Sequence, residues 1–161
     1  MYTSEGLIEF HNRTHESLKK LIKHCGQFQP EELDKEIPGF GYSTLRRQIH
    51  HAIGAERYWA GVLEGRMDIN DDVSDCETIE KLEEYRKLTF DITGNYFNNA
   101  SSAELNNARP MMTWGNKEKV LVPAQVFMRT LTHAYQHQGQ IMAMCRILGK
   151  PVPAGLDYPI A

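Results

Sequence analysis

Apolar residues recur every three or four positions along four long stretches of the chain, which is the spacing of one face of an α-helix. The stretches are Ser4 to Cys25, Ser43 or Thr44 to Glu64, Thr78 to Asn98, and Pro123 to Leu148. Ser43 and Thr44 each suit the N-terminal cap of the second stretch, and Pro123 suits the first turn of the fourth. The pattern therefore predicts four long amphipathic helices.

The segments between these helices carry turn signals of their own. Ser74 with Glu77 fits a capping box that opens the third helix. Between the third and fourth helices, the stretch MMTWGNKEKVLV predicts a small β-hairpin with Gly115-Asn116 as its two-residue turn. Four helices of this length predict an all-α four-helix bundle, and long loops in such a domain often line a functional mouth.

The composition is that of an ordinary globular protein and limits the classes of function. The 161 residues weigh 18.5 kDa, which suits one domain over residues 1–161. A net charge of −3 and a pI near 6.2 argue against nucleic acid as a partner, because such partners need a basic surface. No stretch reaches the roughly 20 apolar residues that span a bilayer, so no membrane partner is expected. The N-terminus lacks the pattern of a signal peptide, and three scattered cysteines suit a reducing compartment, so we expect a cytoplasmic protein.

The stretch THAYQHQGQI places His133 and His137 four residues apart on the last predicted helix. Residues i and i+4 project side by side, which lets two imidazoles reach one metal ion, as in zinc-binding helices. At about 100° per residue their neighbours on the helix surface are Thr130, Ala134, Ile141 and Met144. Two unpartnered imidazoles in a bundle core would be costly, which favours a metal site over the alternative of a polar strip beside a buried face.

A third ligand is expected from a facing helix, and the stretch IHHAIGAERYW offers His50 and His51. His51 falls at one edge of the apolar arc of that helix, whereas His50 falls on the opposite, solvent side, so His51 is the candidate ligand. Glu56 lies near the centre of the arc, and we favour a buried hydrogen bond or ion pair for it over a catalytic role. His11 and His15 form a second i, i+4 pair, and the sequence leaves their role as ligands open.

Three more residues are candidates for contacts around this centre. Gln140 lies seven residues past His133 and almost directly above it, where a glutamine can orient a ligand or hold a metal-bound water. Tyr135 and Trp114 are further candidates, either beside the ligands or at the mouth of the site. We therefore predict Gln140 and Tyr135 as residues that assist the chemistry.

These features together resemble the DinB-like (YfiT-like) superfamily. The resemblance rests on a histidine followed by AERYW on the second helix, on HxxxHxGQI in the fourth helix, and on RxLGxPxP after it. The matching stretches are TLRRQIHHAIGAERYW, VPAQVFMRTLTHAYQHQGQIMAMCRILGKPVP and the loop PGFGYS, so the likeness extends over nearly the whole chain.

The resemblance implies an up-down-down-up bundle, a homodimer, and a divalent metal ion held by three histidines, which match His51, His133 and His137. Three nitrogen donors suit Zn, Ni or Fe. The chain departs from the family pattern at Gln138, where Arg or Lys is frequent, and at Arg129, where a further histidine is frequent. Both positions are close enough to the histidines to change the charge around a substrate.

The superfamily, as the resemblance implies, includes thiol transferases that use bacillithiol, mycothiol-dependent isomerases and metal-dependent hydrolases. Three protein ligands leave an open coordination position, as in catalytic sites. A divalent ion there can lower the pKa of bound water, or bind and deprotonate a low-molecular-weight thiol. We therefore expect a metal-dependent thiol S-transferase or hydrolase that acts on a small molecule. The alternative is a non-catalytic stress-response protein, of the damage-inducible kind, that holds a metal or a small ligand.

Overall fold

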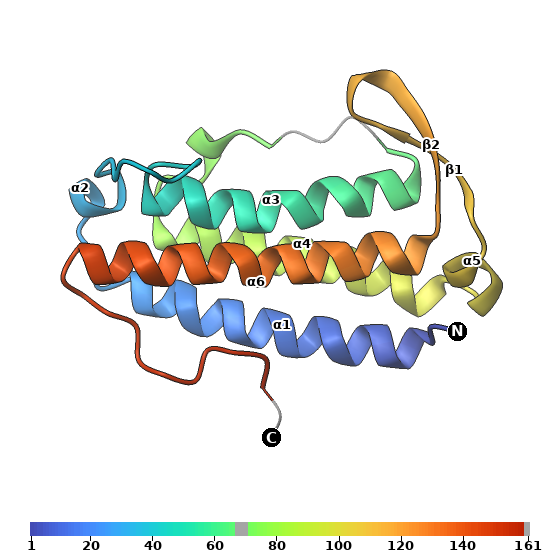
Figure 1. Cartoon of the computed structure of the whole chain (residues 1–161), viewed down its shortest axis with the longest axis horizontal. Coiled ribbons are helices and arrows are strands. Elements are labelled where there is room, and N and C mark those ends of the chain that lie inside the picture. Colours follow the sequence, from blue (N-terminus) through green and yellow to red (C-terminus); the bar gives the residue numbers. More distant parts are fainter. Residues whose placement is uncertain (67–70, 160–161) are drawn as a thin grey trace.

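The structure is a computed structural model that describes residues 1–66 and 71–159. Within these ranges, four long helices lie side by side along the molecule (Figure 1). They are α1 (Ser4–Cys25), α3 (Leu45–Glu64), α4 (Ile79–Asn99) and α6 (Pro123–Ile147). The shorter elements are α2 (Pro30–Leu33), η1 (Val73–Asp75), α5 (Ser102–Asn106), β1 (Arg109–Thr113), η2 (Trp114–Asn116) and β2 (Lys117–Leu121). The predicted all-α class, with a small hairpin before the last helix, is confirmed.

The helices follow the up-down-down-up order. In Figure 1, α1 and α6 run in one direction while α3 and α4 run in the other. Around the bundle, α3 packs against α4 and α6, and α1 packs against the same two helices. Because α3 and α4 are parallel, the connection between them returns along the length of the bundle, and its described part covers α3. No helix of the described residues is both long and apolar enough to cross a bilayer.

Most predicted helix ends agree with the structure, and two local predictions are wrong. Thr44 caps α3, where its hydroxyl accepts from the backbone amide of Arg47. Ser74 does not open α4: it lies in the separate turn η1, and Thr78 caps the helix instead. The turn of the hairpin has three residues rather than two, because Thr113 pairs with Lys117.

The glycine of the hairpin turn was nevertheless placed correctly by the sequence. Gly115 and Asn116 have φ values of 65° and 57°, in the left-handed region that glycine and asparagine tolerate best. The first residue of this turn, Trp114, packs against Tyr58 and Trp59 of α3.

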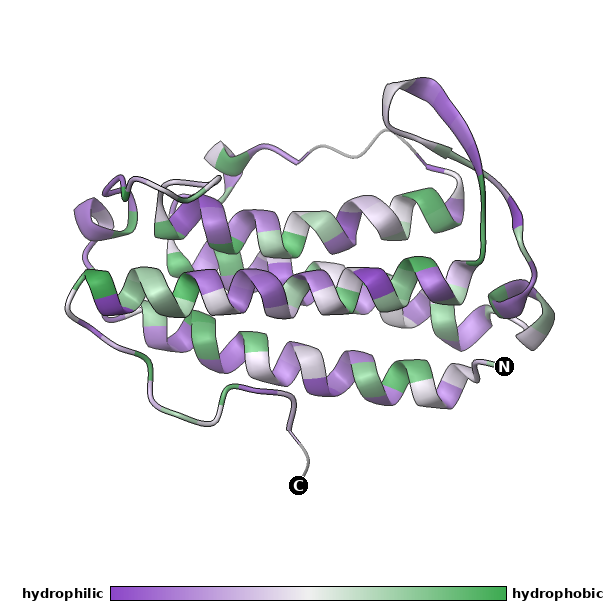
Figure 2. Ribbon diagram, in the orientation of Figure 1, coloured by the Kyte–Doolittle hydropathy of each residue, from purple (hydrophilic) through white to green (hydrophobic). Residues whose placement is uncertain are grey.

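The hydrophobic core is divided by a polar layer halfway along the bundle. One apolar cluster fills the end near α2, around Leu21, Ile49 and Met144, and another fills the opposite end, around Phe97 and Phe127. Figure 2 shows this division along α6, whose middle turns are more hydrophilic than its ends. The buried polar side chains are contributed by all four helices and include His11, His15, Gln48, Glu56, Arg86, Thr89, Thr93, Thr130, His137 and Gln138.

Glu56 is the centre of one half of this layer. Its two carboxylate oxygens each lie 2.8 Å from an imidazole Nε2, one of His11 and one of His15. Arg86 from α4 donates from Nη1 to Nδ1 of His15 at 3.1 Å and pairs with Glu83. The prediction that Glu56 has a buried partner is confirmed, and the contact joins α1, α3 and α4.

The charge of Glu56 is stabilised by its neighbours. Burial alone would raise the pKa of this carboxyl, but the imidazoles of His15 and His11 outweigh burial and hold the pKa well below its usual range. Burial lowers the pKa of His15, so its ring stays neutral at pH 7. The cluster is therefore a carboxylate held by two N–H donors.

Replacing Glu56 by glutamine should destabilise the bundle. In Glu56→Gln the amide loses the charge and turns an N–H group toward an imidazole N–H, which leaves a buried donor without an acceptor. We expect a loss of about 3 kcal/mol in the free energy of unfolding, measured by urea denaturation. The exposed Glu64→Gln on the same helix is the control and should change it by less than about 0.5 kcal/mol. Equal stabilities of the two variants would contradict this role of Glu56.

Candidate metal centre

The other half of the polar layer is formed by three histidines between α3 and α6. His133 Nε2 lies 3.3 Å from His51 Nε2 and 3.0 Å from His137 Nε2. The three rings meet nearly edge to face, with interplanar angles of 76° to 81°. The structure thus brings together the three residues that the sequence singled out as ligands.

All three imidazoles are electrically neutral at pH 7. Burial is the main cause that lowers the pKa of each, and it lowers that of His137 to about 4 with help from the neighbouring rings of His133 and His51. The charge of Arg129 further lowers the pKa of His133. Neutral imidazoles keep a lone pair on one nitrogen, which is the form that binds a metal ion.

A hydrogen-bonded pair of glutamines, Gln48 and Gln140, lies on the Nδ1 side of His137. The side-chain amide of Gln48 lies 2.7 Å from His137 Nδ1 and is also hydrogen-bonded to Gln140. As the amides stand, Gln48 Nε2 also donates to Gln140 Oε1. A rotation of 180° exchanges the two ends of a glutamine amide, so when Gln48 and Gln140 are both turned, the oxygen of Gln48 accepts the proton of Nδ1 and the nitrogen of Gln140 donates to that same oxygen. That tautomer leaves Nε2 of His137 free to bind a cation. Gln140 thus contacts the amide that contacts His137, and its predicted part in the chemistry stays a prediction.

Aromatic packing positions the third histidine. Tyr42, in the connection before α3, stacks on the ring of His51 with centroids 4.0 Å apart and planes 20° apart. Neither Tyr42 nor Gln48 was expected from the sequence. Tyr42 lies in a connection with no periodicity, and Gln48 carries no signal except its place one turn before His51.

The donor set fits a divalent metal ion. Three neutral nitrogen donors face one another at distances suited to one shared cation, and imidazole is a ligand for Zn, Ni and Fe. His11, His15 and Glu56 also lie close enough together to share a cation, but Arg86 opposes it. A guanidinium only donates, so Nδ1 of His15 accepts and its Nε2 carries the proton directed at Glu56. The three-histidine cluster is therefore the candidate metal centre.

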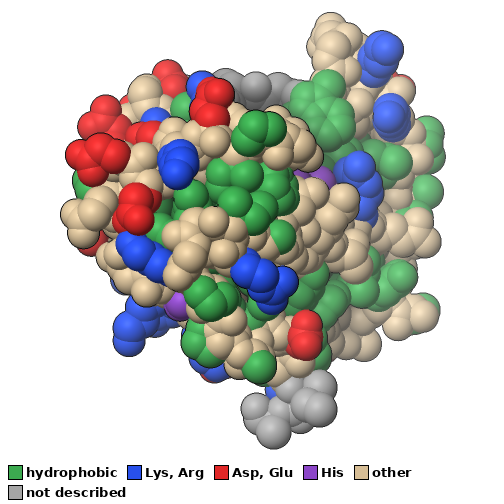
Figure 3. All heavy atoms as spheres, turned by 60° about the vertical axis from the view of Figure 1, so that its left-hand side comes forward, with side chains coloured by type: hydrophobic (Ala, Val, Ile, Leu, Met, Phe, Trp, Pro, Cys, Tyr) green, Lys and Arg blue, Asp and Glu red, His purple; other side chains and the backbone are tan. Residues whose placement is uncertain are grey.

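The candidate centre opens into a pocket at the surface. A cavity of about 470 Å³ is lined by His51 and His133 together with Trp59, Trp114 and Arg129. A neighbouring cavity of about 520 Å³ contains His51 and His50. Figure 3 shows a histidine at the surface below the hairpin, between hydrophobic and basic side chains. A small molecule can therefore reach the histidines from solvent.

Asp71 lies at the rim of both cavities and was not expected from the sequence. Its Oδ1 accepts a hydrogen bond of 2.6 Å from the hydroxyl of Tyr85 and lies 3.2 Å from Nε2 of His50. A Cβ at Gly54 would come within 2.5 Å of Asp71 Oδ2, so only glycine lets the carboxylate lie this close to α3. A glycine in the middle of a helix, beside two histidines, was the signal that another segment approaches there.

The prediction for His50 is wrong. It was assigned to the solvent side of its helix, yet only 7% of its surface is exposed. The ring is stacked on Tyr85 of α4 and covered by Asp71, because the connection between the parallel helices crosses this face of α3. His50 therefore holds Asp71 and is separate from the three-histidine cluster.

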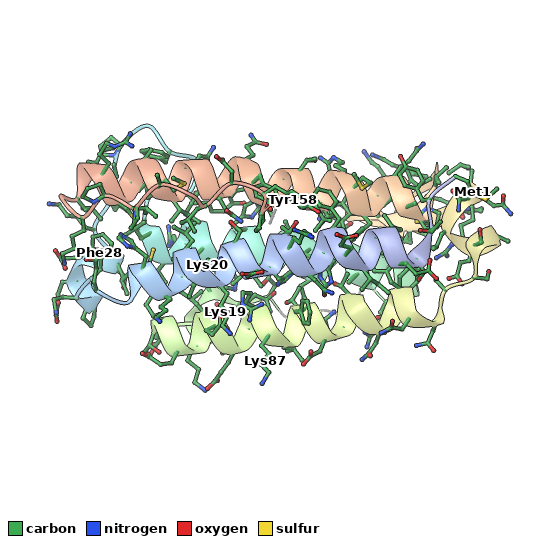
Figure 4. All side chains as sticks on the ribbon, turned by 90° about the horizontal axis from the view of Figure 1, so that it is seen from below. Met1, Lys19, Lys20, Phe28, Lys87 and Tyr158 are labelled. Atoms are coloured by element: carbon green, nitrogen blue, oxygen red, sulfur yellow. The ribbon has the colours of Figure 1, made fainter. Side chains whose placement is uncertain are left out.

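Tyr135 does not lie beside the histidines. Residues two positions apart on a helix project about 200° apart. Tyr135 is two positions from both His133 and His137, so it is on the opposite face of α6. Its ring faces Tyr158, with centroids 6.4 Å apart, and Tyr158 also contacts Phe10 of α1. Figure 4 shows Tyr158 between α1 and α6. The structure thus places Tyr135 in the packing of the C-terminal segment rather than in the site.

The neutral histidines predict how the stability of the metal-free protein depends on pH. The folded-state pKa values of His15, His51, His133 and His137 are all depressed, so below about pH 6.5 the unfolded chain binds more protons than the folded one. The free energy of unfolding should therefore fall from pH 7 to pH 5, by at most about 1.4 kcal/mol per pH unit for each buried histidine and less for the half-exposed ones.

This pH dependence can be measured by urea denaturation of chelator-treated protein at pH 7, 6 and 5. His137→Gln should make the dependence shallower, because it removes the histidine with the most depressed pKa of the three. A free energy of unfolding that is constant across this range would contradict neutral, buried histidines.

Comparison with known proteins places the chain in a family. A search of curated proteins gives no match. The family model described as the DinB family matches residues 1–160, which is nearly the whole length of the chain. The three histidines, the order of the helices and this match agree, and the chain belongs to the DinB family.

Proposed function

We propose that this DinB-family protein is a divalent-metal-dependent enzyme that activates a low-molecular-weight thiol or water for attack on a small molecule. The observation that carries the proposal is the convergence of His51, His133 and His137 beside an open pocket. These side chains would hold Zn, Ni or Fe through Nε2, with Gln48 orienting His137 through Nδ1. When bound by only three protein ligands, such an ion would act as a Lewis acid and make a coordinated thiol or water more acidic.

Asp71 is the proton acceptor in the proposed reaction. Its carboxylate lines the same pocket as His51 and His133 and is oriented by Tyr85 and His50. The histidines themselves would have their lone pairs engaged, so they could not take up a proton. Asp71 is therefore the residue that we assign to receive the proton released by the thiol or water.

Thiol transfer is the form of the reaction that we favour over hydrolysis. The resemblance to thiol transferases supports it, and the pocket has walls of Trp59, Trp114 and Tyr58, which suit the apolar body of an electrophile. The two reactions differ in the nucleophile, so assays with thiols and with esters separate them.

Metal binding should depend on the three histidines and on no others. We expect one divalent ion per chain by elemental analysis, and a loss of affinity of more than about 100-fold in His51→Ala or His137→Ala, because each removes a ligand. His24→Gln, outside both histidine clusters, is the control and should bind as the wild type does. Two ions per chain would contradict the assignment of the His11, His15 and Glu56 cluster to hydrogen bonding.

The role of Asp71 predicts a loss of turnover without a loss of metal. In a conjugation assay with thiols and a chlorinated aromatic electrophile, Asp71→Asn should lower kcat by about 100-fold, because an amide cannot take up the proton. Metal content should stay at one ion per chain. The neighbouring Asp72→Asn is the matched control. Full activity of Asp71→Asn would exclude it as the base, and a metal-loaded protein inactive on both thiol and ester panels would favour a binding protein.

A further inference from the structure

Arg129 lies one helical turn before His133 on the same face of α6. Its guanidinium carbon is 5.6 Å from the centre of the Trp59 ring, and its side chain is exposed. Among the described residues, no carboxylate lies within ion-pair distance of Arg129, in contrast to Arg13, Arg46, Arg66 and Arg86, which all have one. The guanidinium of Arg129 thus lines the pocket, and within residues 1–66 and 71–159 no side chain takes up its hydrogen-bond donors, which leaves them available to a ligand.

Three aromatic rings form the wall next to Arg129. Trp114, from the hairpin turn, lies parallel to Tyr58 with centroids 4.3 Å apart, and Trp59 meets both rings edge-on. Trp114 is 56% exposed although it is large and apolar. Stacked rings that are only partly buried, beside a cation, offer a flat apolar surface to a ligand that also carries a negative charge.

The two charges of the pocket are separated along α3. Asp71 lies over Gly54, whereas Arg129 lies over Trp59, five residues further along the helix. His51 and His133 line the wall of the same pocket. An anionic group is attracted to the Arg129 side and repelled from the Asp71 side, so the pocket has a defined polarity.

We propose that Arg129, with the wall of Trp59, Trp114 and Tyr58, binds the carboxylate end of a small molecule that has a planar apolar body. A guanidinium matches a carboxylate through two parallel N–H···O bonds, and the rings take the apolar part. The opposite end of the molecule then lies at His133, one turn away. That this pocket receives the substrate rests on the proposed function; the binding of the anion does not.

Intrinsic fluorescence tests the inference without any turnover, because both tryptophans of the chain line this pocket. The purified protein is titrated with 3-phenylpropionate and with its neutral analogue 3-phenylpropionamide, and tryptophan emission is recorded. We expect a saturable change with the acid and an affinity for the amide that is at least about tenfold weaker. Arg129→Gln should lower the affinity for the acid by about tenfold and leave that for the amide unchanged.

Lys119→Gln is the matched control, because Lys119 lines a neighbouring cavity of about 440 Å³ that shares Trp59, Trp114 and Arg129 but lacks the histidines. Its affinity for the acid should equal that of the wild type. Equal affinity for acid and amide, no saturable change with either, or a larger loss in Lys119→Gln than in Arg129→Gln would overturn the inference. If the protein binds the acid but no metal, the proposed function is wrong and the inference stands. If it binds metal but not the acid, the inference alone is wrong.

Discussion

Glu56 carries a carboxylate into the middle of the bundle, and both of its oxygens are held by imidazoles of α1. A buried charge that loses its partners is strongly unfavourable, so this contact resists both rotation of α3 and sliding of α3 along α1. His51 lies five residues earlier on α3, about 140° round the helix. The direction in which His51 points toward α6 is therefore set in part by a contact on another side of the same helix.

The same requirement for partners explains why two clusters of similar composition differ in chemistry. Each cluster has an i, i+4 histidine pair on one helix and a third group from α3. Around His137 the outer contact is an amide, which can present either a donor or an acceptor. Around His15 the outer contact is Arg86, which can only donate. The residue that contacts Nδ1 therefore decides whether Nε2 of the same ring holds a proton or is available to a cation.

The sequence was sufficient for those parts of the molecule that depend on periodicity. The four long helices, the hairpin and the three converging histidines follow from apolar spacing and from the geometry of one helix at a time. Contacts made by the connections were beyond such reasoning: Tyr42, Asp71 and the burial of His50 depend on where non-periodic segments cross the bundle. Tyr135 was misplaced for a simpler reason: it is two residues away from both His133 and His137, and this spacing puts it on the opposite face of α6, where it packs near Tyr158.

The candidate ligands come from the middle of two rigid helices, while Tyr42, Asp71 and Trp114 at the mouth come from the connections between helices. Insertions and substitutions in surface connections are tolerated far more readily than changes in a packed core. A protein of this kind can thus acquire a new specificity by changes in its loops, while the three histidines and the helices that position them stay the same. Differences in specificity between such proteins are therefore expected first in the length and the aromatic residues of the connection between α3 and α4 and of the hairpin.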